Sequence, residues 1–111
     1  MYVVTREDLS IPQQLVQSTH SAIRFQHEHS EIAKDWDINS QYLACLSTKD
    51  EESLKQLIKK AESKDIKYTV FIEPDINNEM TSVTFEPSDL ARRLTSSLPK
   101  MFKNLNLKKE E

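Results

Sequence analysis

The chain has 111 residues, of which 37% are hydrophobic and 30% charged, and its formal net charge is −3. This length and composition predict one globular domain, residues 1–99, and exclude a disordered chain. The acidic charge argues against a general polyanion binder. No apolar run reaches the roughly 18 residues of a membrane helix, and the first ten residues do not have the pattern of a signal peptide.

The charge is divided unevenly along the chain. Residues 1–86 hold 9 Lys and Arg against 15 Asp and Glu, whereas residues 87–111 hold 6 against 3. The basic C-terminal section can touch phosphate locally, although a solvated helix and tail explain the same pattern. Residues 100–111 are expected to be a fraying tail. The single Cys45 excludes an internal disulfide, suits a reducing cytoplasm, and is interpreted as strand packing rather than as a nucleophile.

The chain contains no glycine. Phosphate-binding loops of the Walker and dinucleotide types need glycine for close backbone approach, so both kinds of site are excluded. Positive φ angles are expected to fall on Asn or Asp, which tolerate the left-handed region. His20, His27 and His29 do not share a metal-ligand spacing with a carboxylate, so no metal or cofactor is predicted.

In the first half of the chain, residues 2–5 (YVVT) predict a short buried strand. A helix is expected to follow and to end near position 28, with Ser10 as N-cap and Gln13 at capping-box spacing. The residues expected on its inward face are Leu15, Val16, Thr19, Ala22, Ile23 and Gln26. Residues 30–36 predict a second short helix, in which Trp36 anchors against the core.

In the second half, three more strands are expected over residues 41–47, 66–72 and 80–86. The last two are joined by a turn rich in Pro, Asp and Asn, which favours an antiparallel hairpin. Thr48 with Glu51 predicts the capping box of an amphipathic helix. The buried face of that helix is expected to be Leu54, Leu57, Ile58 and Ala61. Ser88 is expected to cap a last helix that stops near Pro99.

The element order β-α-(α)-β-α-β-β-α predicts the α/β class. Helical crossovers imply parallel pairing between strands, and the closing hairpin adds antiparallel pairing. We therefore expect a single three-layer domain, in which helices cover both faces of a mixed four-stranded sheet.

A row of polar side chains on the first helix consists of Gln13, Gln17, His20 and Arg24. At about 100° per residue these positions lie within one stripe. The row starts just after the first strand, where α/β sheets gather ligands and where a helix N-terminus favours anions. It is either a polar outer face that lacks carboxylates or the floor of a binding cleft at the sheet edge.

This region resembles the type 2 peptidyl-tRNA hydrolases, the archaeal and eukaryotic type. The stretch VVTREDL…QQLVQSTHSA is similar to the opening of that family, through Arg6, Asp8, Leu9, Gln17, His20 and Ala22. The resemblance continues through the middle helix, DEESLKQLIKKAESKDIKYTVF, and the last hairpin, and covers most of residues 2–98. It implies cleavage of the ester between peptide and tRNA by a cytoplasmic homodimer.

The resemblance also implies a catalytic set. In the family this set is a lysine in the turn before the first helix, an aspartate after the third strand and a threonine on the fourth. The threonine corresponds to Thr81 and the aspartate to Asp75, but the lysine position holds Gln13. The turn, SIPQ, is also two residues shorter. The sequence therefore resembles the divergent branch that lacks the lysine, which includes the single-domain peptidyl-tRNA-hydrolase-like proteins of eukaryotes.

Hydrolysis of an ester needs a base beside the attacking water and donors aimed at the developing oxyanion. His20 is the candidate base, because imidazole exchanges protons near neutral pH. Asp75 would orient the base or the water, Thr81 would hold the water, and Gln13 would donate through its amide. Each also has a structural explanation, since threonine suits a strand and aspartate suits a turn.

The remaining candidates would bind the substrate. Gln17 is expected to line the cleft, and the candidate phosphate contacts are Arg6, Arg24, Arg92 and Arg93. Arg6 and Asp8 also fit a simple ion pair at the end of the strand. The alternative to an enzyme is a non-catalytic module that binds an RNA end, a nucleotide or a protein in the same cleft.

Overall fold

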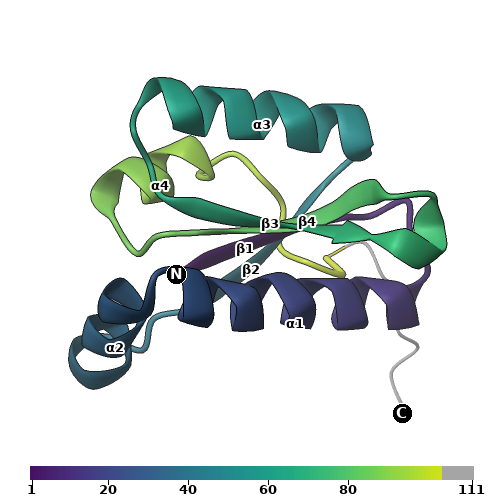
Figure 1. The fold of residues 1–111 in the computed structure, drawn as a ribbon. Helices are drawn as coiled ribbons and strands as arrows, with labels where there is room; N and C mark the ends of the chain where they lie inside the picture. Colours follow the sequence, from purple (N-terminus) through teal and green to yellow (C-terminus); the bar gives the residue numbers. More distant parts are fainter. Residues whose placement is uncertain (104–111) are drawn as a thin grey trace, which may run out of the picture.

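The fold is that of a computed structural model, in which residues 1–103 are described (Figure 1). Four strands form one sheet in the order β2-β1-β4-β3. β1 (Tyr2–Arg6) pairs in parallel with β2 (Ala44–Thr48) and antiparallel with β4 (Glu79–Phe85). β3 (Tyr68–Glu73) is the other edge strand and forms an antiparallel hairpin with β4. The predicted mixed sheet and its closing hairpin are confirmed.

Helices cover both faces of this sheet, as predicted. α1 (Ile11–Glu28) packs on one face and α2 (Ser30–Asn39) packs against α1. α3 (Glu51–Ser63) and the short α4 (Asp89–Leu94) cover the opposite face (Figure 1). The parallel β1–β2 pair is joined by the crossover through α1 and α2, as the element order requires.

The apolar core lies between the sheet and α3. Four residues of α3 are buried there, and they are the predicted ones: Leu54, Leu57, Ile58 and Ala61. They pack against side chains of alternate strand positions, which include Tyr2, Val4, Leu46, Val83 and Phe85. The helical period of α3 and the two-residue period of the strands thus bury one continuous cluster.

The face of α1 that packs on the sheet differs from the prediction. Its buried residues are Gln14, Gln17, Ser21 and Phe25. The predicted inward residues Leu15, Val16 and Ile23 are instead about half exposed. The reason is that this face of the sheet is itself polar, and its hydroxyls need partners. Ser21 Oγ lies 2.9 Å from Thr84 Oγ1, for example.

This orientation of α1 predicts that truncating a buried side chain costs much more stability than truncating an exposed one nearby. Phe25 is fully buried, so Phe25→Ala is expected to lower the free energy of unfolding by about 3–5 kcal/mol. Ile23 is 53% exposed, so Ile23→Ala should cost less than about 1 kcal/mol. Urea unfolding of the two variants measures both values. Equal costs would contradict the assigned face.

Two of the predicted N-caps are confirmed and one is wrong. The Ser10 hydroxyl accepts from the Gln13 backbone N–H, and Ser88 caps α4 in the same way. α3 is capped by Asp50, whose carboxylate accepts from the Ser53 N–H at 2.9 Å, and not by Thr48. Thr48 is the last residue of β2, so its backbone belongs to the sheet. The end predicted for the last helix is also wrong, because α4 already ends at Leu94.

Two side chains expected in the core lie elsewhere. Trp36 is only half-buried, and its indole N–H donates to the Tyr42 carbonyl at 2.6 Å, which ties α2 to the segment before β2. Cys45 on β2 is exposed, whereas α1 packs on β1, β3 and β4. Partial burial still raises the pKa of its thiol, so the prediction that Cys45 is not an activated nucleophile agrees with its surroundings.

The segment after α4 returns to the sheet and extends it beyond β2. Lys100 forms an antiparallel bridge with Leu46, the Pro99 carbonyl accepts from Ser47 N–H, and the Met101 N–H donates to the Cys45 carbonyl. Part of the predicted tail is therefore paired. The rest of it, residues 104–111, lies outside the described residues.

Candidate active site

A β-bulge brings two hydroxyls of β4 to the face under α1. Ser82 pairs with Phe71 and Met80 with Ile72, so Thr81 is an extra residue with no opposite partner on β3. Strict alternation would place Thr81 on the same face as Val83, in the apolar core. Because of the bulge, both Thr81 and its neighbour Ser82 instead contact Gln17 of α1.

Gln17 is the centre of a hydrogen-bonded network. Its side-chain carbonyl accepts from the Thr81 hydroxyl at 2.7 Å. Its amide N–H groups donate to Gln13 Oε1 at 3.0 Å and to Glu73 Oε1 at 2.8 Å. Gln17 and Thr81 are both 0% exposed, whereas Gln13 is exposed and Glu73 is half-buried. Only the outer members of the network can therefore touch a ligand.

Glu73, which the sequence did not single out, supplies the carboxylate of this network. Its pKa is lowered mainly by the hydrogen bond from Gln17 and next by the backbone N–H of Asp75, and the nearby His20 contributes as well. Asp75, the predicted acid, lies in the exposed turn η1 (Pro74–Ile76) and holds Glu73 through its backbone. Glu73 and Asp75 are only two residues apart, at the end of β3 and in the turn that follows, so the sequence gave no signal to distinguish the two carboxylates.

The lowered pKa of Glu73 predicts a pH dependence of stability. A carboxylate with a lowered folded-state pKa stabilises the fold above the ordinary glutamate pKa, and this contribution is lost as the pH falls through the lowered value. Glu73→Gln removes the ionisable group. We therefore expect the difference in unfolding free energy between wild type and variant to shrink between pH 6 and pH 3 in urea titrations. A difference that stays constant would contradict the assignment.

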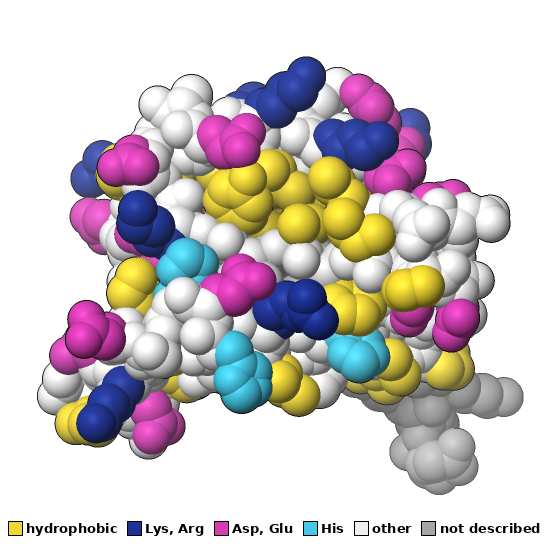
Figure 2. Space-filling view, in the orientation of Figure 1, with side chains coloured by type: hydrophobic (Ala, Val, Ile, Leu, Met, Phe, Trp, Pro, Cys, Tyr) yellow, Lys and Arg dark blue, Asp and Glu magenta, His cyan; other side chains and the backbone are white. Residues whose placement is uncertain are grey.

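The next members of the polar row lie over the edge strand β3. The His20 and Phe71 rings are stacked, with centroids 4.3 Å apart and planes inclined by 5°. The Arg24 guanidinium carbon lies 5.6 Å from the centroid of the same ring. Figure 2 shows this side of the molecule, where histidine, basic and hydrophobic side chains alternate along its lower half. The row thus continues from the amides of α1 to an aromatic and basic surface.

The other predicted arginines lie apart from this row. Arg6 is buried, and its guanidinium binds Asp8 through two hydrogen bonds and Glu79 through one at 2.7 Å. These carboxylates raise the pKa of Arg6 still further. Arg92 and Arg93 are exposed on α4, on the face opposite to α1, and both pair with Asp89. The structure therefore brings only Arg24 to the row.

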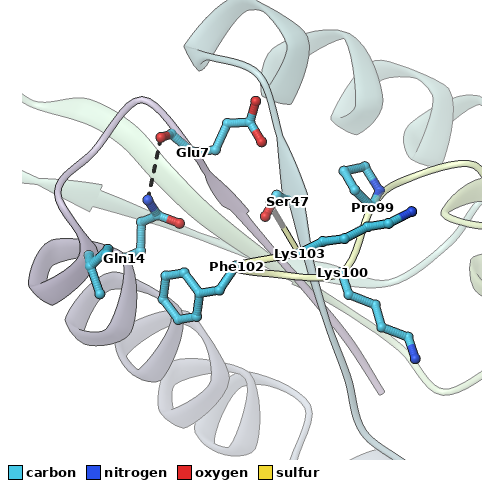
Figure 3. A pocket seen from close by; sticks show the side chains of 8 residues that line it. Glu7, Gln14, Ser47, Pro99, Lys100, Phe102 and Lys103 are labelled. Atoms are coloured by element: carbon cyan, nitrogen blue, oxygen red, sulfur yellow. Dashed lines mark hydrogen bonds between the residues drawn. The ribbon is translucent and has the colours of Figure 1, made fainter. Parts of the chain in front are cut away.

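A separate pocket opens at the other flank of α1, near the ends of the parallel strands (Figure 3). Glu7, Gln14 and Ser47 form one side of it, and residues 99–103 close the other. The Gln14 amide donates to the carbonyls of Glu7 and Leu9, so its position is fixed by the turn that follows β1. The pocket does not contain any of the predicted catalytic residues.

Within residues 1–103, no three His, Cys, Asp or Glu side chains cluster in a way that would hold a metal ion. Nor does the same part of the chain contain a helix with the length and hydrophobicity needed to cross a membrane.

The polar row of α1 and the Gln17 network lie at one edge of a mixed sheet in a small α/β domain. The model of the family "Peptidyl-tRNA hydrolase PTH2" matches residues 1–102, and the chain belongs to this family. Membership implies peptidyl-tRNA hydrolase function and a peptidyl-tRNA substrate, as the sequence predicted. A comparison with curated proteins found no match.

Proposed function

We propose that this chain cleaves the ester of peptidyl-tRNA at a site formed by Gln13, His20 and Glu73. The observation that supports this most is the 2.7 Å hydrogen bond between Thr81 and Gln17, because it joins the polar row of α1 to β4. Around it lie a base, a carboxylate and an exposed amide. Ester hydrolysis requires this combination of a base and a hydrogen-bond donor.

The reaction then runs in two steps. The His20 imidazole takes a proton from water while the water oxygen bonds to the acyl carbon, and the Gln13 amide donates to the resulting oxyanion. As the oxyanion collapses, the bond from the acyl carbon to the ribose oxygen breaks, and the imidazolium returns its proton to that oxygen. The products are the free peptide acid and tRNA with a free ribose hydroxyl. Glu73 accepts the Gln17 amide at 2.8 Å and brings a carboxylate to the edge of the site.

Thr81 and Gln17 act in this proposal as positioning residues. Both are fully buried, so neither touches the water or the substrate. Thr81 fixes the orientation of the Gln17 amide, which in turn orients Gln13 and Glu73. Asp75 contributes through the N–H that it donates to Glu73. This replaces the direct roles that the resemblance implies for Thr81 and Asp75.

We further propose that the chain represents the branch of the family without the catalytic lysine. The first lysine in the sequence is Lys34, so no lysine side chain lies in the segment from β1 through α1. Gln13 supplies a donor without charge. A peptidyl-tRNA cleavage assay with the purified chain tests the function, since release of free peptide supports an enzyme. Intact substrate would favour the alternative, a non-catalytic binding module with the same cleft.

Finally, we propose a cytoplasmic homodimer in which the exposed apolar residues at the start of α1 form the contact. Ile11, Leu15 and Val16 are 41–51% exposed, and adjacent exposed apolar side chains favour association. Leu15→Glu combined with Val16→Glu should shift the protein from dimer to monomer in analytical ultracentrifugation and leave its circular dichroism unchanged. A wild-type protein that is already monomeric would disprove this proposal. The exposed Cys45 suits a reducing compartment.

A further inference from the structure

The face of β3 that points toward α3 carries a row of apolar side chains that no helix of the described chain covers. Tyr68, Val70 and Ile72 occupy alternate positions of the strand and therefore share this face. Tyr68 and Val70 are half-buried, and Ile72 is 45% exposed. Figure 2 shows hydrophobic side chains gathered at the centre of this side of the molecule. We refer to these three residues as the β3 row.

The β3 row is open because one helix is too narrow to cover the whole sheet. α3 packs mainly on β4 and β1. Packed helices lie about 8–10 Å apart and paired strands about 4.7–4.9 Å apart, so one helix covers about two strands. The space beside α3 and over β3 therefore has the width of one further helix.

We propose that this space binds an amphipathic helix of a partner protein, with acidic side chains on the flank that faces α3. The apolar stripe of that helix packs on the β3 row, the mode in which an amphipathic helix lies in an apolar groove. β3 has 6 residues and spans roughly 20 Å, which matches a helix of about 13 residues. α3 itself has 13 residues and covers the neighbouring strands in the same way.

The side of α3 that borders the β3 row favours an acidic partner. Two carboxylates on this side are already hydrogen-bonded to the sheet, Glu62 by the Tyr68 hydroxyl at 2.7 Å and Glu51 by a β4 N–H at 2.9 Å. Lys55 and Lys59 lie on the same stripe of the helix as Glu62, and both are exposed. Two ammonium groups one turn apart match two carboxylates one turn apart on an adjacent helix.

A helix fits this surface better than an added strand does. The carbonyls of Lys67 and Glu73 accept hydrogen bonds from the β4 side, so the backbone groups of the β3 row point away from β4. His29 Nε2 lies 3.2 Å from the outward carbonyl of Tyr68 and occupies that end of the edge. Pairing with another strand along all of β3 is therefore obstructed, whereas the apolar row extends along the whole strand.

Two designed helical peptides of about 14 residues test this inference by fluorescence anisotropy with the purified chain. Both carry leucines along one face, and they differ only on the flank, which has glutamates in one peptide and lysines in the other. The wild-type chain should bind the glutamate peptide about tenfold more tightly than the lysine peptide. Lys55→Glu combined with Lys59→Glu should reverse this preference.

The matched control is Lys60→Glu combined with Lys64→Glu, which makes the same change of charge on a different flank of α3 and should leave the preference in place. For the apolar contact, Ile72→Ser should raise the Kd of the glutamate peptide by about tenfold. Ile38→Ser removes an exposed isoleucine from α2 and should not change that Kd.

The inference is overturned if the wild-type chain prefers neither peptide, if the two double variants behave alike, or if the two isoleucine variants have the same effect. It is also overturned if Ile72→Ser converts a dimer to a monomer in analytical ultracentrifugation, because a second copy of the chain then covers the β3 row. None of these measurements involves peptidyl-tRNA, so their outcome is independent of the proposed function.

Discussion

Replacing His20 with alanine is expected to lower kcat for peptidyl-tRNA cleavage by about 10²–10⁴-fold, the usual contribution of a general base. His20 is an exposed imidazole of α1 that stacks on Phe71 and is near enough to Glu73 to contribute to the lowered pKa of that carboxylate. Without it, no group in this position takes the proton of the attacking water. Single-turnover cleavage at saturating protein measures the chemical step separately from substrate binding.

The matched control is His27→Ala, which removes an exposed imidazole of α1 two turns further along the helix. We expect His27→Ala to leave the single-turnover rate at saturation within about threefold of wild type. Equal losses in the two variants would refute the role of His20 as base. Because His20 is exposed, its replacement should leave the unfolding free energy nearly unchanged.

The second large effect is a gain. Gln13→Lys is expected to raise the cleavage rate by about tenfold, since it replaces a neutral amide donor with an ammonium, and a charge-assisted hydrogen bond contributes about 1–1.5 kcal/mol more than a neutral one. Gln13 stands in the first turn of α1, where the helix has no acidic residue that would neutralise the new lysine. Its outer position in the network allows the longer side chain to reach solvent.

Gln13→Met provides the control for this substitution, because it keeps a side chain of similar length without a donor. It should lower the rate below that of wild type. If lysine and methionine give the same rate while RNA binding is intact, position 13 does not face the oxyanion. The proposed role of Gln13 as the donor to the oxyanion would then be wrong.

The sequence alone was sufficient for the order and type of the elements. The strand patterns, the Ser10 and Ser88 caps and the apolar stripe of α3 depend on local periodicity and local hydrogen bonds. The mixed sheet follows from this order, because a helix between two strands allows parallel pairing and a short turn requires antiparallel pairing. The polar row of α1 was also visible as a row, since spacing along a helix fixes which residues share a stripe.

Only the tertiary structure decided which stripe of α1 faces the sheet. Leu15, Val16 and Ile23 form a stripe that periodicity assigns to a core, but the sheet face beneath α1 carries hydroxyls, and amide and hydroxyl side chains pack there instead. The bulge at Thr81 likewise has no local signature, because it depends on pairing with β3. These two long-range features bring Glu73 into the site and bury Gln17. The sequence thus determined the candidate side chains of the site. Strand pairing and helix orientation determined which of these side chains can contact a substrate.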